Sequence, residues 1–327
     1  MTTGGSLVEL LDRHVAGLDG VSRRLWERAL AGPVREFLRR PGKGMRGRLV
    51  ETGFQLAGGA DLGPDLPAAL ELLHAGSLVL DDIQDASLER RGGPALHRVC
   101  GTGVALNSGN WMVFWSVQMI GQARFPAPDA AAEAQRRTAM TLVACHQGQA
   151  LDLALPVGEL EPAEIPEVVA ASTSLRTASL TELAAALGGL AAGAEANIVD
   201  QLGAIGRELG VALQMLDDLG GLCAVSRRDK GNEDLVNARV TWPWAWAVER
   251  ASGPGFAALQ AEARQVASGA RPDPLRNRLS ALVEETGRTR ARNILRGALQ
   301  RAERTFPPSP AREALAADIA RLETHYG

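Results

Sequence analysis

Apolar residues recur at helical spacing through most of the chain, and this periodicity strongly restricts the fold. Ala, Leu, Arg and Glu fill positions i, i+3, i+4 and i+7, whereas the period-two alternation of β-branched residues that marks strands is scarce. The pattern predicts an all-α protein. We expect helices at residues 5–17, 21–39, 44–57, 65–91, 103–123, 128–153, 163–172, 175–193, 196–224, 239–251, 255–267, 275–303 and 310–325.

The breaks between these segments carry glycine and proline, as in GGADLGPDLP and SGARPDP, and none is long enough to link two domains. With 46% hydrophobic residues, the chain has enough apolar material for one large core. We therefore expect residues 1–327 to form a single domain, with residues 1–6 disordered.

Charge and cysteine content exclude several classes of protein. A net charge of -3 provides no basic surface for nucleic acid, so we expect no such partner. Cys100, Cys145 and Cys223 are far apart and odd in number, which argues for a reducing compartment and against a disulfide framework or a zinc site. The N-terminal segment lacks the basic and apolar regions of a signal peptide, and charges interrupt the other apolar stretches. We expect a cytoplasmic protein with no stable membrane insertion.

Opposite charges are concentrated in LVLDDIQDASLERRGG, residues 78–93. Asp81 and Asp85 are four residues apart and share a helix face, with Asp82 beside them. Like charges this close need a compensating cation, and carboxylates without Cys or His ligands suit Mg²⁺. Arg90 and Arg91 are candidate phosphate ligands, because guanidinium groups match phosphate oxygens. A solvated acidic helix face followed by a basic turn is the alternative interpretation.

A second acidic pair, Asp217 and Asp218, interrupts the otherwise apolar helix LQMLDDLGG. Two acidic helical patches that face one cavity can hold several Mg²⁺ ions and, with them, a diphosphate. Lys230, in the following RRDKGNEDL, is a further candidate phosphate contact. The alternative is a helix end that frays into a charged loop.

Six motifs between about residue 35 and residue 247 resemble, in order and spacing, those of the trans-isoprenyl diphosphate synthases, which include farnesyl and geranylgeranyl diphosphate synthases. The matching stretches are GKGMRG, ELLHAGSLVLDD, DDIQDASLERRGG, GQALDL, LQMLDDLGG and DLVNARVTWPWA. The resemblance implies the isoprenoid synthase fold, an antiparallel helix bundle around a central cavity. It also implies a Mg²⁺-dependent prenyltransferase that joins isopentenyl diphosphate to an allylic prenyl diphosphate. Similar proteins are homodimers, and the apolar helix at 103–123 is a candidate interface.

The resemblance implies a role for each matched residue. The catalytic set would be Asp81, Asp85, Asp217, Arg90 and Lys230. Three Mg²⁺ ions would bind to these aspartates together with Asp82 and Asp218 once diphosphate is present. Isopentenyl diphosphate would be held by Lys43, Arg46, His74 and Arg91, and the other substrate-binding residues would be Arg176, Thr177, Gln149, Asp152 and Gln214.

Several positions depart from the family pattern. The fifth position of the second motif, usually aspartate, is Gly221, so one carboxylate is absent. Arg176 and Arg239 stand where lysine is common, and Leu213 replaces a phenylalanine. The usual C-terminal basic cluster is missing from IARLETHYG.

Product length would depend on residues one or two turns before the first motif. Gly76 and Ser77, then Leu73, lie along the path of a growing chain, and the nearest two are small. Similar short-chain synthases often carry an aromatic residue there, so Gly76 predicts a product of about twenty carbons (C20) or longer. Trp111 and Trp115 are candidate floors of this pocket. Alternatively, Gly76 is a helix-crossing contact and the tryptophans are ordinary core residues.

Two other functions are compatible with the sequence. A class I terpene cyclase on the same fold is favoured by the broken second motif, and by Trp111, Phe114 and Trp115, because aromatic faces stabilise carbocations. The intact residues for isopentenyl diphosphate and an aromatic content of only 4% oppose it. A non-catalytic subunit of a heteromeric prenyl synthase is favoured by the lost aspartate and opposed by the intact DDIQD.

Overall fold

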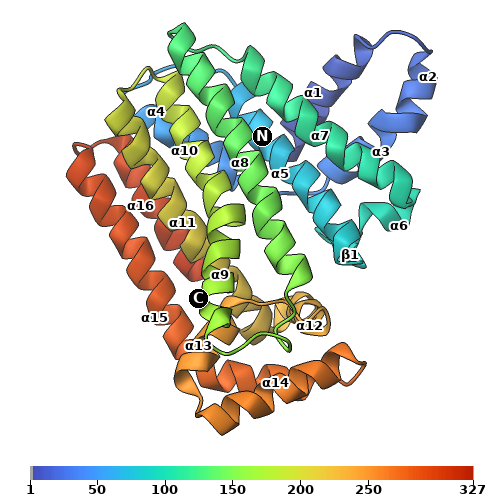
Figure 1. The fold of residues 1–327 in the computed structure, drawn as a ribbon. Coiled ribbons are helices and arrows are strands. Elements are labelled where there is room, and N and C mark those ends of the chain that lie inside the picture. Colours follow the sequence, from blue (N-terminus) through green and yellow to red (C-terminus); the bar gives the residue numbers. More distant parts are fainter. Residues whose placement is uncertain (1–2, 327) are drawn as a thin grey trace.

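Long helices account for most of the chain, and the all-α prediction is confirmed (Figure 1). The computed structural model describes residues 3–326. In chain order the elements are α1 (Thr3–Ala16), α2 (Arg23–Trp26), the π-helix η1 (Glu27–Ala31), α3 (Gly32–Leu38), α4 (Met45–Leu56), α5 (Asp65–Gln84), β1 (Glu89–Arg90), β2 (Gly93–Pro94), α6 (Leu96–Cys100), α7 (Thr102–Gln122), α8 (Pro128–Ala154), α9 (Glu164–Thr173), the π-helix η2 (Ser174–Ala178), α10 (Ser179–Ala191), α11 (Ala196–Cys223), the 3₁₀-helix η3 (Val225–Arg227), α12 (Arg228–Val236), α13 (Trp242–Arg250), α14 (Gly253–Ala267), α15 (Asp273–Thr305) and α16 (Pro310–Tyr326).

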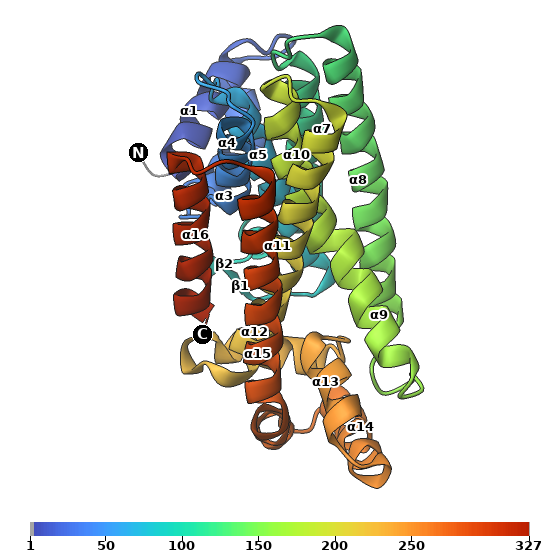
Figure 2. The same cartoon turned by 90° about the vertical axis from the view of Figure 1, so that its left-hand side faces the viewer.

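The longest helices run side by side along one direction, and α13 and α14 lie across one end of this bundle (Figures 1 and 2). Neighbours in the bundle are α5 with α7 and α4, α10 with α4 and α11, and α11 with α15. The helices of the bundle turn apolar side chains inward. The buried apolar side chains form one continuous cluster from Leu7 in α1 to Ile319 in α16.

The first helix begins within the N-terminal segment that we expected to be disordered. Helix α1 begins at Thr3, so residues 3–6, which we expected to be disordered, are helical, and residues 1–2 lie outside the described part of the chain.

The helix expected at residues 65–91 is shorter than predicted. Helix α5 ends at Gln84, and β1 and β2 then form an antiparallel hairpin. The turn between these strands is Arg91–Gly92, whose φ angles of 53° and 73° suit a two-residue hairpin turn. Arg40 holds the hairpin by donating to the carbonyls of Arg90 (3.0 Å) and Pro94 (2.7 Å).

Two short helices were not expected from the sequence. Helix α6 is a single five-residue element, and α12 comes from the polar segment RDKGNEDLV. Few residues of α12 are apolar, so hydrophobic periodicity gives no signal there. Its position beside the end of α5 is what brings Lys230 to the acidic motifs.

Within residues 3–326, no single helix is both long and apolar enough to cross a membrane, although α11 and the segment Val225–Val236, bent by 100°, meet that test jointly.

Candidate active site

The two acidic motifs lie at the ends of two long helices, and α12 connects them. Asp81 and Asp82 occupy the last turn of α5, and Asp217 and Asp218 lie near the end of α11. Helix α12 directly follows η3 after α11, and Glu233 on it accepts a 2.6 Å hydrogen bond from Ser87 Oγ, just beyond α5. The two motifs are therefore joined through α12 and border one polar region.

Arg90 neutralises part of the first motif. Its Nε donates to Asp82 Oδ1 at 2.6 Å, and its Nη2 lies 3.4 Å from Asp81 Oδ2. Asp82 is fully buried, and burial raises the pKa of its carboxyl to about 6 despite the Arg90 charge. Asp82 Oδ2 is buried without a hydrogen-bond partner. The first motif thus carries more buried negative charge than Arg90 compensates.

Residues of the GQALDL motif extend this network through the π-helix η2. Gln149 Nε2 contacts Asp81 Oδ1 at 3.3 Å, and Gln149 Oε1 accepts from Arg176 Nη1 at 2.8 Å. Arg176 Nη2 in turn donates to Asp152 Oδ1 at 2.9 Å. Gly148 permits this approach, since a Cβ there would lie 2.7 Å from Arg176 Cγ. The structure therefore brings Gln149, Asp152 and Arg176 together beside Asp81.

Arg239 closes this network on its other side. It forms an ion pair with the Asp85 carboxylate, and its Nη1 donates to the Asp152 carbonyl at 2.7 Å. Both side chains are almost inaccessible, at 10% exposed for Arg239 and 7% for Asp85. Burial and the Asp81 charge raise the pKa of Asp85, against the opposing effect of Arg239. The sequence indicated only that Arg239 replaces a common lysine, so this pairing was not predicted.

Lys230 supplies positive charge from α12. Its Nζ lies 3.3 Å from Asp234 Oδ1 and 3.6 Å from Glu233 Oε1. Burial lowers its pKa, but the charges of Asp234, Asp81 and Glu233 outweigh this effect, so the pKa of Lys230 is raised and the side chain stays charged. Lys230 therefore stays charged within range of Asp81, and its contact with phosphate stays a prediction.

In the second motif, Asp217 is paired with an arginine and the fifth position has no carboxylate. Asp217 forms an ion pair with Arg227 of η3, a residue that sequence reasoning did not single out. Gly221 lies against α12, where a Cβ at position 221 would be 3.3 Å from Gly231 Cα. A side chain at the fifth position would require α12 to shift by a few tenths of an ångström.

Asp218 is engaged entirely within the protein. Its Oδ1 accepts from Gln214 Nε2 at 2.7 Å, and its Oδ2 accepts from the Trp242 backbone N–H at 2.9 Å. Thr177 Oγ1 donates to Gln214 Oε1 at 2.6 Å, so the three predicted residues Thr177, Gln214 and Asp218 form one chain. Burial raises the pKa of Asp218 to about 7 despite these bonds. Asp218 thus holds Trp242, the first residue of α13, in place. The sequence indicated only that Asp218 lies next to Asp217 in the second motif.

The residues expected to hold isopentenyl diphosphate lie near one another. Burial, together with the charges of Arg46 and Arg91, keeps the pKa of His74 well below its ordinary value. Gly42 lets the chain pass closely over Arg91, since a Cβ there would be 3.2 Å from Arg91 Nη2. Burial lowers the pKa of the neighbouring Lys43, against the charge of Asp217. These residues therefore lie close to one another, and Lys43 also lies near Asp217 of the second motif.

Gly76 was expected to leave space for a growing prenyl chain, and this expectation is wrong because α7 fills the space beside it. A Cβ at position 76 would lie 2.7 Å from the Gly109 carbonyl oxygen and 2.9 Å from Val113 Cγ2. Gly76 is thus the helix-crossing contact between α5 and α7, because only a residue without a side chain lets the two backbones approach this closely. Leu73 is buried in the core, and Ser77 Oγ donates to the His74 carbonyl at 2.9 Å.

Two aromatic residues of α7, Trp111 and Trp115, pack against α1. Trp111 and Trp115 stack against each other with ring centroids 4.8 Å apart, and both contact the His14 ring of α1. Phe114 is 72% exposed. The tryptophans therefore form a packing cluster with α1, and Phe114 faces away from the core.

The first motif fits Mg²⁺ by the chemistry of its donors. Among the described residues, no three His, Cys, Asp or Glu side chains gather closely enough to hold a metal by themselves. Mg²⁺ is commonly bound by one or two carboxylates with water and substrate phosphate completing its shell. Asp81 has only long contacts, at 3.3 and 3.4 Å, and Asp82 Oδ2 has no hydrogen-bond partner. Hard oxygen donors therefore remain available there.

The chain is similar to known prenyl synthases. It is 33% identical to the geranylgeranyl diphosphate synthase of Mycobacterium tuberculosis over 75% of this chain and 69% of that protein. It is 29% identical to the copalyl diphosphate synthase of Talaromyces verruculosus over 70% of this chain, but spans only 23% of that protein. The crystal structure of the geranylgeranyl pyrophosphate synthase from Corynebacterium glutamicum, complexed with isoprenyl diphosphate and magnesium, superposes with a TM-score of 0.82 at 22% identity, covering 98% of this chain and 96% of that one.

The sequence profile described as Polyprenyl synthetase matches residues 27–268, well over half of the chain. The motifs, the helical fold and these similarities agree, and the chain belongs to the polyprenyl synthetase family.

Proposed function

We propose that this protein is a trans-prenyltransferase that condenses an allylic diphosphate with isopentenyl diphosphate to give a longer trans-prenyl diphosphate. The observation that carries the proposal is the set of cations around the first motif. Arg90, Arg176, Lys230 and Arg239 come from four segments and surround Asp81, Asp82 and Asp85. This charge pattern supports binding of a diphosphate together with Mg²⁺.

The roles of the residues follow from charge. Asp81 and Asp85 are the proposed ligands of Mg²⁺, which when bound would neutralise charge on the departing diphosphate. Arg90, Arg176 and Lys230 would bind the same diphosphate, and Gln149 and Asp152 hold Arg176 in position. Cations fixed in advance at the place where negative charge develops lower the barrier to ionisation.

A second group of residues would orient the second substrate. Lys43, Arg46 and Arg91 are the proposed ligands of isopentenyl diphosphate, and His74 would donate a hydrogen bond as a neutral imidazole, in line with its lowered pKa. Holding the double bond against the allylic carbon replaces a bimolecular encounter with a positioned reaction.

We propose a product of C20 or longer, although not for the reason that the sequence first gave. The space once expected at Gly76 is filled by α7, so it no longer supports a long product. Support comes instead from the 33% identical Mycobacterium tuberculosis relative, which is named as a geranylgeranyl diphosphate synthase.

We also propose a homodimer formed through α7. Val104, Leu106 and Phe114 on this helix are 39%, 44% and 72% exposed, and α8 adds exposed Met140 and Val143. Exposed apolar side chains grouped on neighbouring helices are typical of protein interfaces. Light scattering on the purified protein tests this, since a monomer at micromolar concentration would contradict it.

Product analysis by mass spectrometry tests the proposed activity. The purified protein is incubated with Mg²⁺ and dimethylallyl, geranyl, farnesyl or geranylgeranyl diphosphate, each with and without isotope-labelled isopentenyl diphosphate. Labelled, longer diphosphates are expected, and their length gives the chain length directly. Unlabelled hydrocarbon from an allylic substrate alone would mean a cyclase, and no product without an added prenyl synthase subunit would mean a non-catalytic partner.

A further inference from the structure

The second acidic motif offers one carboxylate where its family resemblance implies three. Asp218 is bonded through both oxygens to Gln214 and the Trp242 backbone, and Gly221 has no carboxylate. Only Asp217 remains, and it already has a cationic partner in Arg227. In this structure the position beside Asp217 is thus taken by an internal cation, the Arg227 guanidinium group.

Gly221 also takes part in a close contact between two helices, where a Cβ at position 221 would lie 3.3 Å from Gly231 Cα. Gly221 and Gly231 pack backbone to backbone, and a Cβ at Gly231 would lie 2.0 Å from the Gly221 carbonyl oxygen. This contact sets the distance between α11 and α12, the helix that carries Lys230. The missing aspartate is therefore part of how α12 is seated on α11.

Arg227 is held at the surface of α11 beside Asp217. A Cβ at Gly220 would lie 2.6 Å from Arg227 Nη1, so the absence of a side chain at Gly220 makes room for the guanidinium group. The charges of both Asp217 and Arg227 act on Lys43, one of the residues proposed to bind isopentenyl diphosphate. The guanidinium thus borders the space between the two motifs.

We propose that Arg227 replaces the metal ion of the second motif: its guanidinium group binds the allylic diphosphate directly, and the site takes up two divalent ions, at the first motif, instead of three. This inference rests on the proposed prenyltransferase function and revises the expectation that Asp217 and Asp218 bind metal. A guanidinium group supplies positive charge and two parallel hydrogen bonds to phosphate oxygens, and it remains charged at any working pH. Asp217 then positions Arg227.

Metal counting tests the proposal without relying on activity. The protein is equilibrated with Mn²⁺ and inorganic diphosphate, and the bound Mn²⁺ per bound diphosphate is measured by electron paramagnetic resonance after dialysis. We expect two ions for the wild type, two for Asp217→Asn, and fewer for Asp81→Asn. Three ions in the wild type, with one lost in Asp217→Asn, would overturn the inference but leave the proposed function standing.

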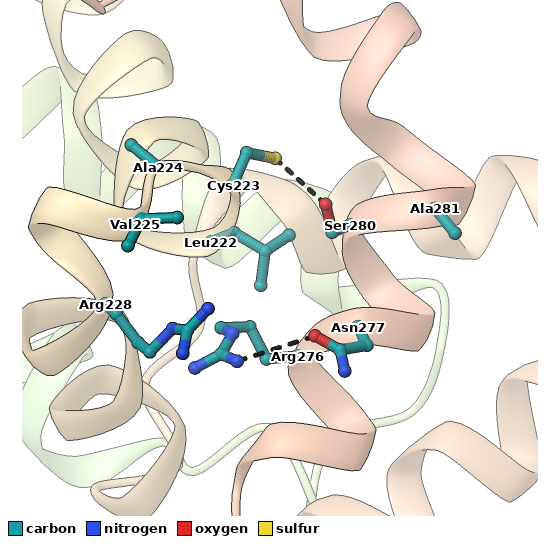
Figure 3. A pocket seen from close by; sticks show the side chains of 9 residues that line it. All are labelled: Leu222, Cys223, Ala224, Val225, Arg228, Arg276, Asn277, Ser280 and Ala281. Atoms are coloured by element: carbon teal, nitrogen blue, oxygen red, sulfur yellow. Dashed lines mark hydrogen bonds between the residues drawn. The ribbon is translucent and has the colours of Figure 1, made fainter.

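Diphosphate affinity gives a second readout. At saturating Mn²⁺, Arg227→Gln should weaken diphosphate binding by about ten- to a hundredfold, and Arg227→Lys should recover part of it. Arg228→Gln is the matched control, because Arg228 points into a separate pocket of about 220 Å³ beside Cys223, Arg276 and Ser280 (Figure 3). Equal affinity in the wild type and Arg227→Gln would overturn the inference.

The two hypotheses fail in different ways. If diphosphate brings no Mn²⁺ to the wild type and Asp81→Asn changes nothing, the proposed function falls together with the inference. Circular dichroism on each variant confirms that the fold is retained, and Arg227→Lys keeps the charge if Arg227→Gln does not fold.

Discussion

Arg239 supports one strong prediction, because it is the buried counter-ion of Asp85. Replacing Arg239 with Gln leaves the Asp85 carboxylate without its ion pair at a position where solvent screens little, since the two side chains are 10% and 7% exposed. Breaking a buried pair on one side costs about 3–5 kcal/mol, and loss of the 2.7 Å bond to the Asp152 carbonyl adds about 1 kcal/mol. We expect Arg239→Gln to lower the free energy of unfolding by that sum in metal-free buffer.

The pH dependence gives the prediction its sign. Burial and Asp81 already raise the pKa of Asp85, and removing Arg239 raises it further above the unfolded value. The destabilisation should therefore grow as the pH rises through the folded pKa and shrink toward low pH, where the carboxyl is neutral in both states. Urea unfolding followed by circular dichroism at pH 5 and pH 8 measures both values.

A double variant provides the control. Asp85→Asn removes the charge that Arg239 compensates, so Asp85→Asn/Arg239→Gln should be more stable at pH 8 than Arg239→Gln alone, with a coupling of about 2–3 kcal/mol. The reasoning is refuted if Arg239→Gln costs less than about 1 kcal/mol, if its cost is the same at both pH values, or if the double variant recovers nothing.

Three further predictions concern single positions. Asp81→Asn should lose Mg²⁺-dependent incorporation of labelled isopentenyl diphosphate by about a hundredfold or more, and full activity would contradict the metal role. The pKa of Asp218 is raised from 3.8 to about 7, so its stabilising contribution is complete below about pH 4 and is lost as the pH rises through 7. Asp218→Asn has no carboxylate to ionise and can still accept from the Trp242 N–H. Between pH 5 and pH 8, its free energy of unfolding should therefore rise by up to about 4 kcal/mol relative to that of the wild type, as measured by urea unfolding in metal-free buffer. The same pH dependence in both proteins would argue against this reasoning. Gly76→Ala should destabilise by about 1–3 kcal/mol in thermal or urea unfolding, because its Cβ meets the Gly109 carbonyl at 2.7 Å, and an unchanged midpoint would show that the helices separate easily.

The local part of the site was predictable from the sequence. Asp81 and Asp85 were expected one helical turn apart, and the Asp85 N–H does donate to the Asp81 carbonyl at 2.8 Å at the end of α5. Spacing within one helix is fixed by the 3.6-residue turn, so this inference needed no tertiary information. The end of the helix was misplaced because the positive φ angle of 53° just after the C-cap Asp85 falls on Ala86, a residue type that gives no sign of it in the sequence.

The counter-ions could not be predicted in this way. Arg239 lies 154 positions after its partner Asp85, and its side chain reaches the first motif only because α12 and the following turn fold back onto α5. Gly76 shows the same limit: sequence places it on the helix face below the motif but does not say that α7 covers that face. Pairings between distant segments depend on which helices pack against each other, and hydrophobic periodicity does not predict those contacts.

The π-helix η2 interrupts an otherwise continuous helix from α9 into α10, and it holds Arg176 and Thr177. A π turn accommodates one more residue than an α turn, so everything before it is rotated by about 100° relative to everything after it. A deletion of one residue within Ser174–Ala178 would produce a more regular helix, yet it would turn either Arg176 or α10 away from its present partners. The irregular turn is thus the local geometry that keeps Arg176 in the polar network and α10 in the helix bundle at the same time.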